Sequence, residues 1–471
     1  MDIDVIKKLI KKYIAGHTEF CRKADVAHRY YRNKTDILIP EPKKQEKKEK
    51  EPLRNADNRI PFNFHGLLVN QKAAYMFTAP PLFDLGSKEA NKALVRLLGD
   101  GYTKICKDLC VNASNTSIAW LHLWKNTEKK LEYAVVPSEQ IIPVWDRGLK
   151  RKLNGVMRHY TEISEEDGSN IDIWEFWNEK VCSTYSVKKD GEDLLIEAYP
   201  IYNVTDEEGI TGKSNEFNHE IGEVPFFPFF NNNIDTGDLD NIKPLIDVYC
   251  KVFSGFVNDL EDIQEVIFVL TNYGGTDLKE FMSDLKEYKA IKVDSEGDGD
   301  KSGVSTLTIE LPVEAREKLL KITRKCIFEQ GQGIDPDPEN FGDSSGVALK
   351  FLYALLELKA GLMETEFRES FGRFIRCACR IQGIKIKDDI IIQTWTRTSV
   401  KNESEEATIA ANSKNIIPDE DIVRNHPWVE NFDRSWEQLQ KQKELENSEI
   451  SDMFPENKEQ QDQSEQQIVM R

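Results

Sequence analysis

The sequence has no long apolar run and no excess of positive charge. No apolar run approaches the roughly 20 residues that a membrane-spanning helix needs, so we expect no contact with a membrane. Residues 1–16 alternate lysine pairs with apolar residues, which does not predict a signal peptide. The 63 Lys and Arg against 82 Asp and Glu give a formal net charge of −19. That balance argues against tight binding to nucleic acid phosphates, although nucleic acid could still slide past such a surface.

Residues typical of metal sites and nucleophiles are sparse and scattered. The eight cysteines are spread through the chain, which favours free buried thiols over disulfides. The seven histidines fall in no spacing typical of metal ligands or of a catalytic base beside its nucleophile. The sequence contains no Gly-x-Ser-x-Gly, His-Glu-x-x-His or Cys-x-x-Cys. We therefore predict no catalytic residue, no metal site and no cofactor.

Two partial motifs lack an essential residue. Residues 209–214, GITGKS, resemble the end of a phosphate-binding loop, but Glu207 stands where the first glycine belongs. Residues 294–303 imitate the start of a calcium loop, but the twelfth position falls on Ser305 or Ile309, which cannot supply a bidentate carboxylate. We expect a turn between strands and a solvated hairpin tip, respectively. The aromatic residues Trp174, Phe176 and Trp177 are expected to pack in a core.

The apolar pattern predicts an α+β protein of several parts. Two helical stretches are expected within residues 1–30, a charged loop at 41–52, and helices before Pro80 and over 87–110. Short runs of β-forming residues separated by turns occupy residues 117–230, which indicates antiparallel sheet. Because strands and helices are segregated along the chain, this is not a βαβ array.

The second half contains two helices that flank a small module. From Leu245 to Ile267 the apolar residues recur about every 3.7 positions, which predicts one helix over 241–270 with Asn241 as its N-cap. A helix over 312–331 opens on Pro312 and ends at Gly331. Residues 271–311 between them form a small α/β module. A polar loop over 331–346, a long helix over 346–381, a strand and two polar helices follow.

An ordered set of segments resembles a known family. The segments NRIPFNFHGLLVNQKAAYMFTAPPLF, VVPSEQIIPVWD, GVMRHY, GDLDNIKPLIDVY with NDLED, SSGVALK and IIPDEDIVRNHPWVENFD occur in this order. Together they are similar to the portal (head–tail connector) proteins of long-tailed bacteriophages. The resemblance covers roughly residues 55–445.

The resemblance implies a portal fold with wing, α-helical stem, small α/β clip and α-helical crown, assembled as a ring around a central DNA channel. Transferred to this chain, the expected parts are N-terminal helices and charged loop (1–54), wing (55–237), first stem helix (238–270), clip (271–311), second stem helix (312–331), tunnel loop (332–345), long wing helix and strand (346–398), crown helices (399–445) and a disordered tail (446–471).

The same resemblance places three groups of site residues. The tunnel loop, facing DNA, contains Asp335, Asp337, Glu339, Asn340, Asp343 and Ser344. The stem contains Asp247, Asp259, Glu261, Asp262, Arg316, Lys321, Arg324 and Lys325. The clip, facing the packaging motor and later the tail adaptor, contains Asp277, Lys279, Glu280, Lys286 and Glu287. We expect the basic residues of the second stem helix to pair with acidic residues of the first rather than to contact DNA.

The function implied is structural. A homo-oligomeric ring, usually of twelve copies, would occupy one capsid vertex of the virion after assembly in the host cytoplasm. It would nucleate capsid assembly, pass double-stranded DNA inward and release it during ejection. The implied partners are the terminase large subunit, the scaffolding and major capsid proteins, and a head-completion or tail adaptor protein.

Two alternatives from other classes are kept. The abundant carboxylates could build a metal-dependent nuclease or another DNA-processing factor, which a metal-dependent cleavage assay would detect. The paired helices could instead belong to a monomeric adaptor that forms coiled coils, which imaging of single particles would distinguish from a ring.

Overall fold

The computed structural model describes residues 3–40, 56–126, 128–164, 168–190, 193–205, 211–262, 267–271, 303–307, 312–337, 346–397, 403–414, 416–424, 426, 429 and 432–453. It divides into two compact units, which are described separately. The first unit comprises Met1–Pro336 with Ala354–Thr398, and the second comprises Asp337–Tyr353 with Ser399–Arg471.

Helices make up the first part of the first unit. They are α1 (Ile3–Tyr31), α2 (Phe64–Met76), α3 (Lys88–Leu98) and α4 (Tyr102–Thr116). The N-terminal segment is thus one continuous helix, not the two that the sequence predicted. The helix predicted over 87–110 is also wrong in one respect, because it is two helices. Gly99, whose φ of +66° suits glycine, ends α3 between them.

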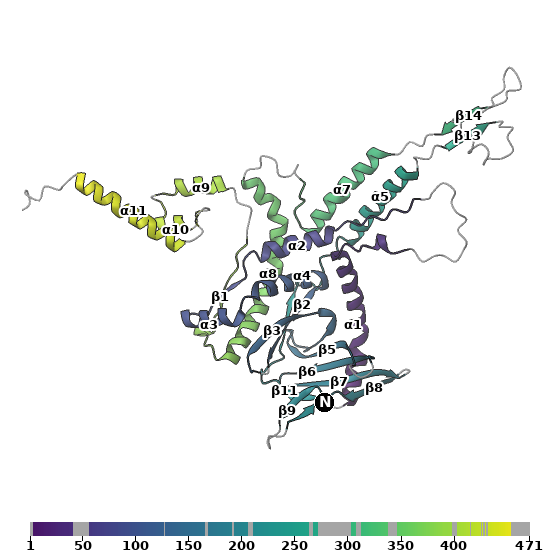
Figure 1. Cartoon of the computed structure of the whole chain (residues 1–471), viewed down its shortest axis with the longest axis horizontal. Helices are drawn as coiled ribbons and strands as arrows, with labels where there is room; N and C mark the ends of the chain where they lie inside the picture. The colour runs from purple at the N-terminus through teal and green to yellow at the C-terminus, as the bar shows by residue number, and fades with distance from the viewer. Residues whose placement is uncertain are drawn as a thin grey trace, which may run out of the picture. The chain divides into compact units, whose positions relative to one another are not determined.

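Two antiparallel sheets follow. The smaller has the order β12–β2–β3, from Phe226–Phe230, Ile118–Lys125 and Leu131–Val136. The larger has the order β11–β7–β6–β5–β4, with β8 also paired to β7; these strands are Glu216–Asn218, Val181–Asp190, Asn170–Trp177, Leu153–Ile163, Ile141–Trp145 and Asp193–Ala198. The antiparallel β region predicted over 117–230 is confirmed, as is the α+β class (Figure 1).

The sheets and helices share apolar cores. Ile6 and Ile10 of α1 pack against Trp174 and Phe176 of β6, while Trp177 lies in a second core with Trp120. All three aromatic residues of β6 are therefore buried, as predicted. The long helix α8 (Gly346–Gln382) matches its prediction, and its Phe371 packs against Phe229 with ring centroids 4.8 Å apart.

Helices α5 (Lys243–Asp262) and α7 (Val313–Gly331) lie side by side and lead to a strand pair (Figure 1). The strands are β13 (Ile267–Thr271) and β14 (Gly303–Leu307), paired antiparallel. The helix predicted over 241–270 is therefore wrong at residues 267–270, which belong to β13, and Asn241 lies two residues before the first residue of α5. The second helix agrees with its prediction, with Pro312 at the N-cap.

The remaining short strands also pair antiparallel. They are β9 (Tyr202–Thr205) with β10 (Thr211–Ser214), and β1 (Leu82–Asp84) with β15 (Ile392–Thr394). Strand β10 contains the Gly-Lys-Ser of the partial phosphate-binding motif. An extended strand presents no helix N-terminus to a phosphate, so the motif does not form a phosphate-binding loop.

The second unit contains α9 (Glu403–Asn412), α10 (Asp419–Arg424) and α11 (Phe432–Met453). Arg424 of α10 stacks over the ring of Phe432, with 4.5 Å between the guanidinium carbon and the ring centroid. Three helices stand where two were predicted. Helix α11 continues to Met453, so the prediction of disorder from residue 446 is wrong up to that residue.

Candidate functional site

The pair of helices α5 and α7 is the site that the sequence singled out, and an apolar cluster holds its base. Ile242, Ile246 and Cys250 are buried along one side of α5. They pack with Leu68 of α2 and Ile327 of α7. The predicted apolar stripe through Leu245, Val252 and Phe256 lies beside this buried side and is only half-buried. Helix α5 therefore has two adjoining apolar faces, of which this chain alone covers one.

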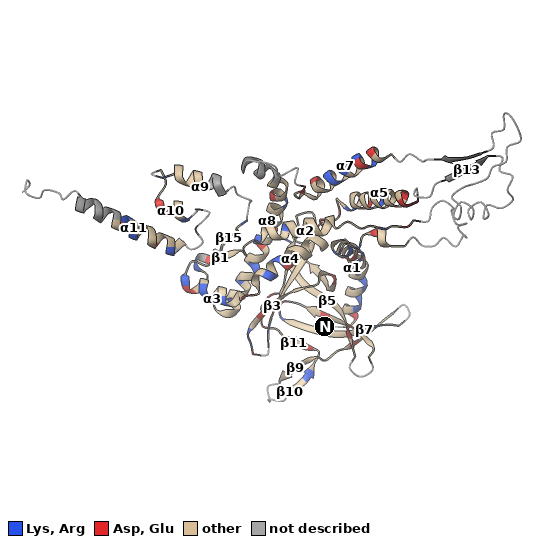
Figure 2. Cartoon of the chain, turned by 45° about the horizontal axis from the view of Figure 1, so that its top comes forward, with Lys and Arg blue, Asp and Glu red and all other residues tan. Residues whose placement is uncertain are grey.

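Acidic and basic residues both occur along the two helices (Figure 2). Arg316 of α7 pairs with Asp259 of α5 and stacks over Phe256 at 5.3 Å. This contact confirms the expected pairing between the helices for one residue. Lys321 and Lys325 instead pair within α7, with Glu317 at 2.9 Å and Glu329 at 3.6 Å.

The acidic residues of α5 contact other parts of the chain as well. At the base, Asp247 accepts hydrogen bonds from Tyr30 and from Lys243, the latter at 2.8 Å. At the far end, Asp262 accepts one from the backbone N–H of Ala56 at 3.0 Å, and Glu261 accepts one from the Asn58 amide. These bonds attach the segment that follows the charged loop to α5, which the sequence gave no reason to expect.

The described part of the predicted tunnel loop is bound to the body at its start. Gln71 donates to the carbonyl of Ile334 at 2.7 Å and accepts from its N–H at 3.1 Å. Arg324 donates to both carboxylate oxygens of Asp335, with Nε–Oδ2 at 2.9 Å and Nη2–Oδ1 at 2.6 Å. A side chain on Gly333 would lie 2.1 Å from Leu68, so the close approach requires glycine.

Asp335 is thus an anchoring residue for the start of the loop. We expect Asp335→Asn to lower the free energy of unfolding by about 1–2 kcal/mol, because the bidentate pair is only partly shielded from water. Chemical denaturation measures this change. The matched variant Arg324→Lys keeps the positive charge but cannot form the bidentate pair. Its free energy of unfolding should therefore fall by only part of the same amount. If Arg324 and Asp335 stabilise the chain as a pair, the double variant Asp335→Asn with Arg324→Gln should lose less free energy of unfolding than the sum of the two single variants. Losses that add up strictly would contradict the anchoring role of the pair.

Several predicted site residues lie outside the described residues. These are Glu339, Asn340, Asp343 and Ser344 of the loop, and Asp277, Lys279, Glu280, Lys286 and Glu287 of the predicted clip. Asp337 is the last described residue before the gap in the loop. The predicted calcium-like segment 294–303 falls almost entirely in the same undescribed stretch.

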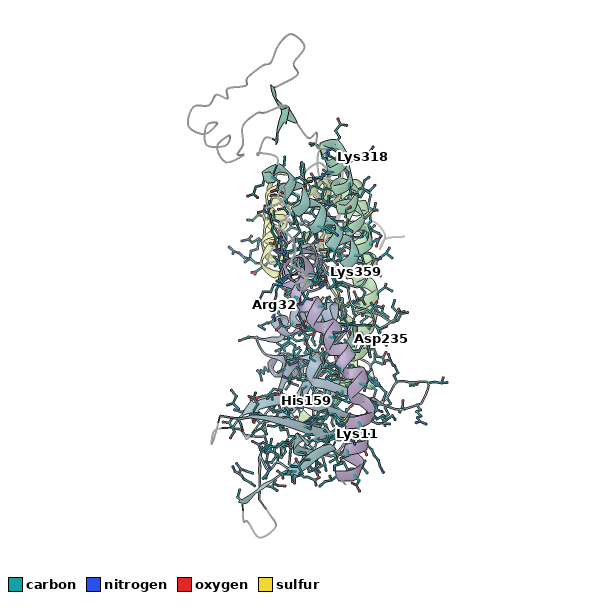
Figure 3. The ribbon with its side chains drawn as sticks, turned by 90° about the vertical axis from the view of Figure 1, so that its right-hand side faces the viewer. Lys11, Arg32, His159, Asp235, Lys318 and Lys359 are labelled. Atoms are coloured by element: carbon teal, nitrogen blue, oxygen red, sulfur yellow. The ribbon has the colours of Figure 1, made fainter. Side chains whose placement is uncertain are left out.

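A buried charge cluster that the sequence analysis missed lies where both helices join the body. Lys72 of α2 and Lys359 of α8 both pair with Asp238, with Nζ–Oδ2 distances of 2.7 and 3.0 Å. The three side chains are 1%, 11% and 4% exposed. Burial raises the pKa of Asp238, but the two ammonium groups outweigh this effect and hold it well below its usual range. Figure 3 shows Lys359 at the base of the helix pair and Lys318 toward its far end.

The cluster connects four elements. Asp238 stands shortly before α5, and its second carboxylate oxygen accepts a hydrogen bond from Asn231 at 3.0 Å. Lys359 also donates to the carbonyl of Gly331, the last residue of α7, at 2.9 Å. Each lysine lies in a mainly apolar stretch, GLLVNQKAAYM and FLYALLELKAGLM, although Glu357 stands two residues before Lys359. A lysine within such a stretch was the available signal for the cluster.

Among the described residues, the side chains typical of metal sites form no metal-binding cluster, and the thiols are mostly buried. No set of three or more His, Cys, Asp or Glu among them could hold a metal ion. All eight cysteines are free thiols; six of them are buried, as predicted, whereas Cys21 and Cys326 are only partly buried. Burial raises the pKa of Cys106 to about 12 and that of Cys110 to about 11, so these thiols are unreactive near neutral pH. None of the described helices combines the length and the apolar character that crossing a bilayer requires.

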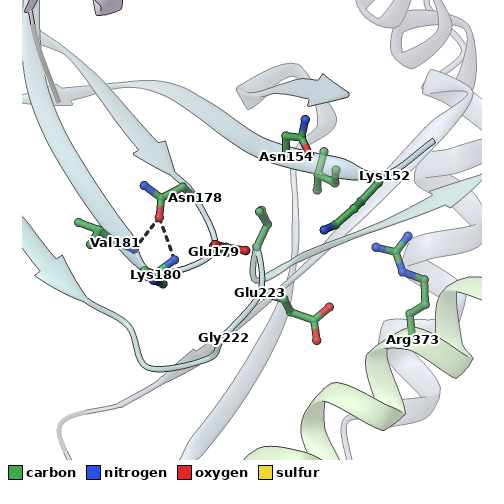
Figure 4. Close-up of a pocket in the computed structure, with 11 residues that line it drawn as sticks. Lys152, Asn154, Asn178, Glu179, Lys180, Val181, Gly222, Glu223 and Arg373 are labelled. Atoms are coloured by element: carbon green, nitrogen blue, oxygen red, sulfur yellow. Dashed lines mark hydrogen bonds between the residues drawn. The ribbon is translucent and has the colours of Figure 1, made fainter. Parts of the chain in front are cut away.

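An open cavity of about 570 Å³ lies between the strands and α8. Figure 4 shows Lys152 and Arg373 on one side of it, Asn178 and Lys180 on the other, and Glu179 and Glu223 between them. The Glu223 carboxylate is engaged by Arg380 of α8 at 2.6 Å. The lining thus combines two acids with three basic residues, and one of the acids is already paired.

Comparisons with known proteins place the chain in a family. The family described as "Phage portal protein, SPP1 Gp6-like" matches residues 10–449. The chain belongs to this family. A curated relative named "Portal protein", from Clostridium phage phiCD119, is 40% identical over 96% of this chain and 99% of its own length. Another "Portal protein", from Bacillus phage SPP1, is 28% identical over 79% of this chain and 74% of its own.

Among solved structures, similar chains occur in the "Virion of native gene transfer agent (GTA) particle". The similarity has a TM-score of 0.42 at 12% identity and covers 75% of this chain and 86% of the other. A chain in the neck of the native particle gives a TM-score of 0.41 at 11% identity, over 76% and 88%. The family membership confirms the portal resemblance found from the sequence and makes the chain a phage portal protein.

Proposed function

We propose that copies of this chain assemble into a ring at one capsid vertex, with α5 and α7 of each copy lining a channel for double-stranded DNA. The ring would have about twelve members, as the portal resemblance implies. The part between the two helices would dock the terminase motor and later the tail adaptor. Scaffolding and capsid proteins would contact the ring during assembly in the host cytoplasm.

The observation that carries this proposal is the uncovered apolar surface of the helix pair. Val248 and Leu260 of α5, and Val313, Leu319 and Ile322 of α7, are each more than two-fifths exposed. Apolar side chains along a helix pair are covered when a neighbouring copy packs against them, and a ring closes such head-to-tail contacts. Ring closure thus accounts for side chains that one copy leaves in water.

The charge balance supports passage of DNA rather than capture. The chain carries 19 more acidic than basic charges. Two basic residues of α7 already pair with acidic residues of this chain: Arg316 with Asp259, and Arg324 with Asp335. Each lysine or arginine used in this way is not available to neutralise a phosphate, which keeps DNA binding weak. We infer no catalysis for this chain: ATP hydrolysis would belong to the terminase.

We expect Ile322→Glu to prevent ring formation while leaving the single chain folded, since Ile322 is 53% exposed there. Burying a charge in place of an isoleucine should weaken each contact between copies by about 10–100-fold. Mass photometry and negative-stain imaging of the purified protein would show rings for the natural chain and single copies for the variant.

The matched control is Val95→Glu on α3, an equally drastic change at a side chain that is 67% exposed but lies away from the helix pair. It should leave the rings intact. Rings formed equally well by Ile322→Glu would refute this role for α7. A natural chain that stays a single copy and cleaves DNA in the presence of Mg²⁺ would favour the nuclease alternative instead.

A further inference from the structure

The buried cluster at the base of the helix pair holds more positive than negative charge. Two ammonium groups, of Lys72 and Lys359, share the single carboxylate of Asp238. The neighbouring His65 does not change this balance of charge. Burial lowers its pKa to about 4, so its side chain is neutral near pH 7. With both lysines protonated, one positive charge has no carboxylate partner among the described residues. Burial accordingly lowers the pKa of Lys359, because an uncompensated charge shielded from water is strongly unfavourable.

The hydrogen-bond donors of the two lysines are also incompletely used. Two ammonium groups provide six N–H donors. The described residues supply one hydrogen-bond acceptor for each lysine, Asn231 Oδ1 for Lys72 at 2.8 Å and the Gly331 carbonyl for Lys359 at 2.9 Å. Asp238 Oδ2 lies within ion-pair distance of both ammonium groups. Among the described residues, each ammonium group therefore has N–H donors left for a further acceptor, and an acceptor that carries negative charge would also balance the lysines.

A cavity of about 70 Å³ borders both lysines. Its lining also includes Asn241, Gln330 and Gln332, and Asp238 is the only acid among the described residues that line it. Since a water molecule occupies about 30 Å³ in the liquid, the space suits a group of a few heavy atoms and excludes a nucleotide.

We propose that this cavity binds one small oxyanion of the inorganic phosphate class. Its oxygens accept the remaining N–H donors of Lys72 and Lys359, and its charge balances the cluster. The oxygens of such an ion point in different directions from its central atom. One ion can therefore accept hydrogen bonds from both ammonium groups and from amide groups of the residues that line the cavity. The bound ion would fasten both stem helices to the body, because Asp238 leads into α5 and Lys359 holds the last carbonyl of α7. This site is separate from the ring function proposed above and does not depend on it.

The test is thermal unfolding of the full-length protein during a titration with inorganic phosphate. Sodium gluconate replaces phosphate at each step so that the ionic strength stays constant. Gluconate is chosen because its anion is too large to enter the cavity. The natural chain should show a saturable rise in midpoint temperature, as expected for a ligand that binds only the folded state. Isothermal titration calorimetry should give a single phosphate site per chain.

Two variants identify the site. Gln332→Glu places a carboxylate at the mouth of the cavity, so it should raise the midpoint without phosphate and weaken the phosphate response by about tenfold or more. Lys359→Met leaves a balanced Lys72–Asp238 pair and should abolish the response. Gln382→Glu, which adds the same charge at the end of α8, should behave like the natural chain. A rise of equal size in all four proteins, as from a general salt effect, would overturn the proposal, and so would the absence of a saturable rise in the natural chain.

Discussion

Asp238→Asn is expected to destabilise the folded chain by about 3–5 kcal/mol, a large part of the stability of a typical domain. The substitution keeps the shape of the side chain but removes the only carboxylate that Lys72 and Lys359 share in their buried surroundings. Both ammonium groups would then lie buried without a counter-charge. Because the cluster joins α2, α8 and the ends of α5 and α7, the loss should appear in the main unfolding transition, measured by urea denaturation followed by circular dichroism.

Asp57→Asn is the matched control. Asp57 pairs with Arg59 at 2.9 Å on the surface, where water screens the charges, so the midpoint should not change measurably. The pKa of Asp238 lies below its usual range in the folded chain, so its stabilising effect is complete above about pH 4 and is lost as the pH falls further. A variant Asp238→Asn as stable as the natural chain at pH 7 would show that the lysines are not charged in the cluster.

The stem helices show which parts of the fold the sequence could predict. Pro312 and Gly331 are local signals for helix ends, and α7 begins and ends beside them. The end of α5 has no such signal, because the apolar period continues through Ile263 and Ile267. Only the pairing of β13 with β14, more than thirty residues further along the chain, makes Ile267–Thr271 a strand. Periodicity within a window cannot detect a distant partner.

The candidate site divides in the same way. The sequence located the helix pair and the start of the loop, because periodicity, proline, glycine and the family resemblance all act on contiguous segments. It did not locate the cluster of Lys72, Asp238 and Lys359, which are separated by more than a hundred residues each. Nor did it show that Asp335 is paired with Arg324, since among 82 acidic residues proximity along the chain identifies few partners.

Lowering the pH from about 6.5 to about 4 is expected to destabilise the protein through two buried histidines. Burial lowers the pKa of His65 to about 4, and it does the same for His122, whose Nδ1–H donates to the Pro225 carbonyl at 2.9 Å. The unfolded chain, with a histidine pKa near 6.5, binds more protons throughout this interval, so stability falls as the pH falls. The difference corresponds to about 3 kcal/mol for each histidine.

The variant His122→Asn tests this directly, because the amide can still donate to the Pro225 carbonyl but does not titrate. It should be less stable at pH 7, since the ring of His122 stacks on Phe226 at 4.2 Å. Its loss of stability between pH 6.5 and 4 should nevertheless be smaller than that of the natural chain by about 3 kcal/mol. Urea denaturation at several pH values gives both quantities.

His65→Gln provides the independent second measurement, since its amide can donate to Asn115 as the Nε2–H of His65 does at 2.8 Å. The two sites share no partner, so their effects on the pH dependence should add. The slope that remains in the double variant would belong mainly to His17, His159 and His219, whose pKa values burial also lowers. An unchanged slope in both single variants would mean that these histidines are protonated in the folded chain, which their burial makes strongly unfavourable.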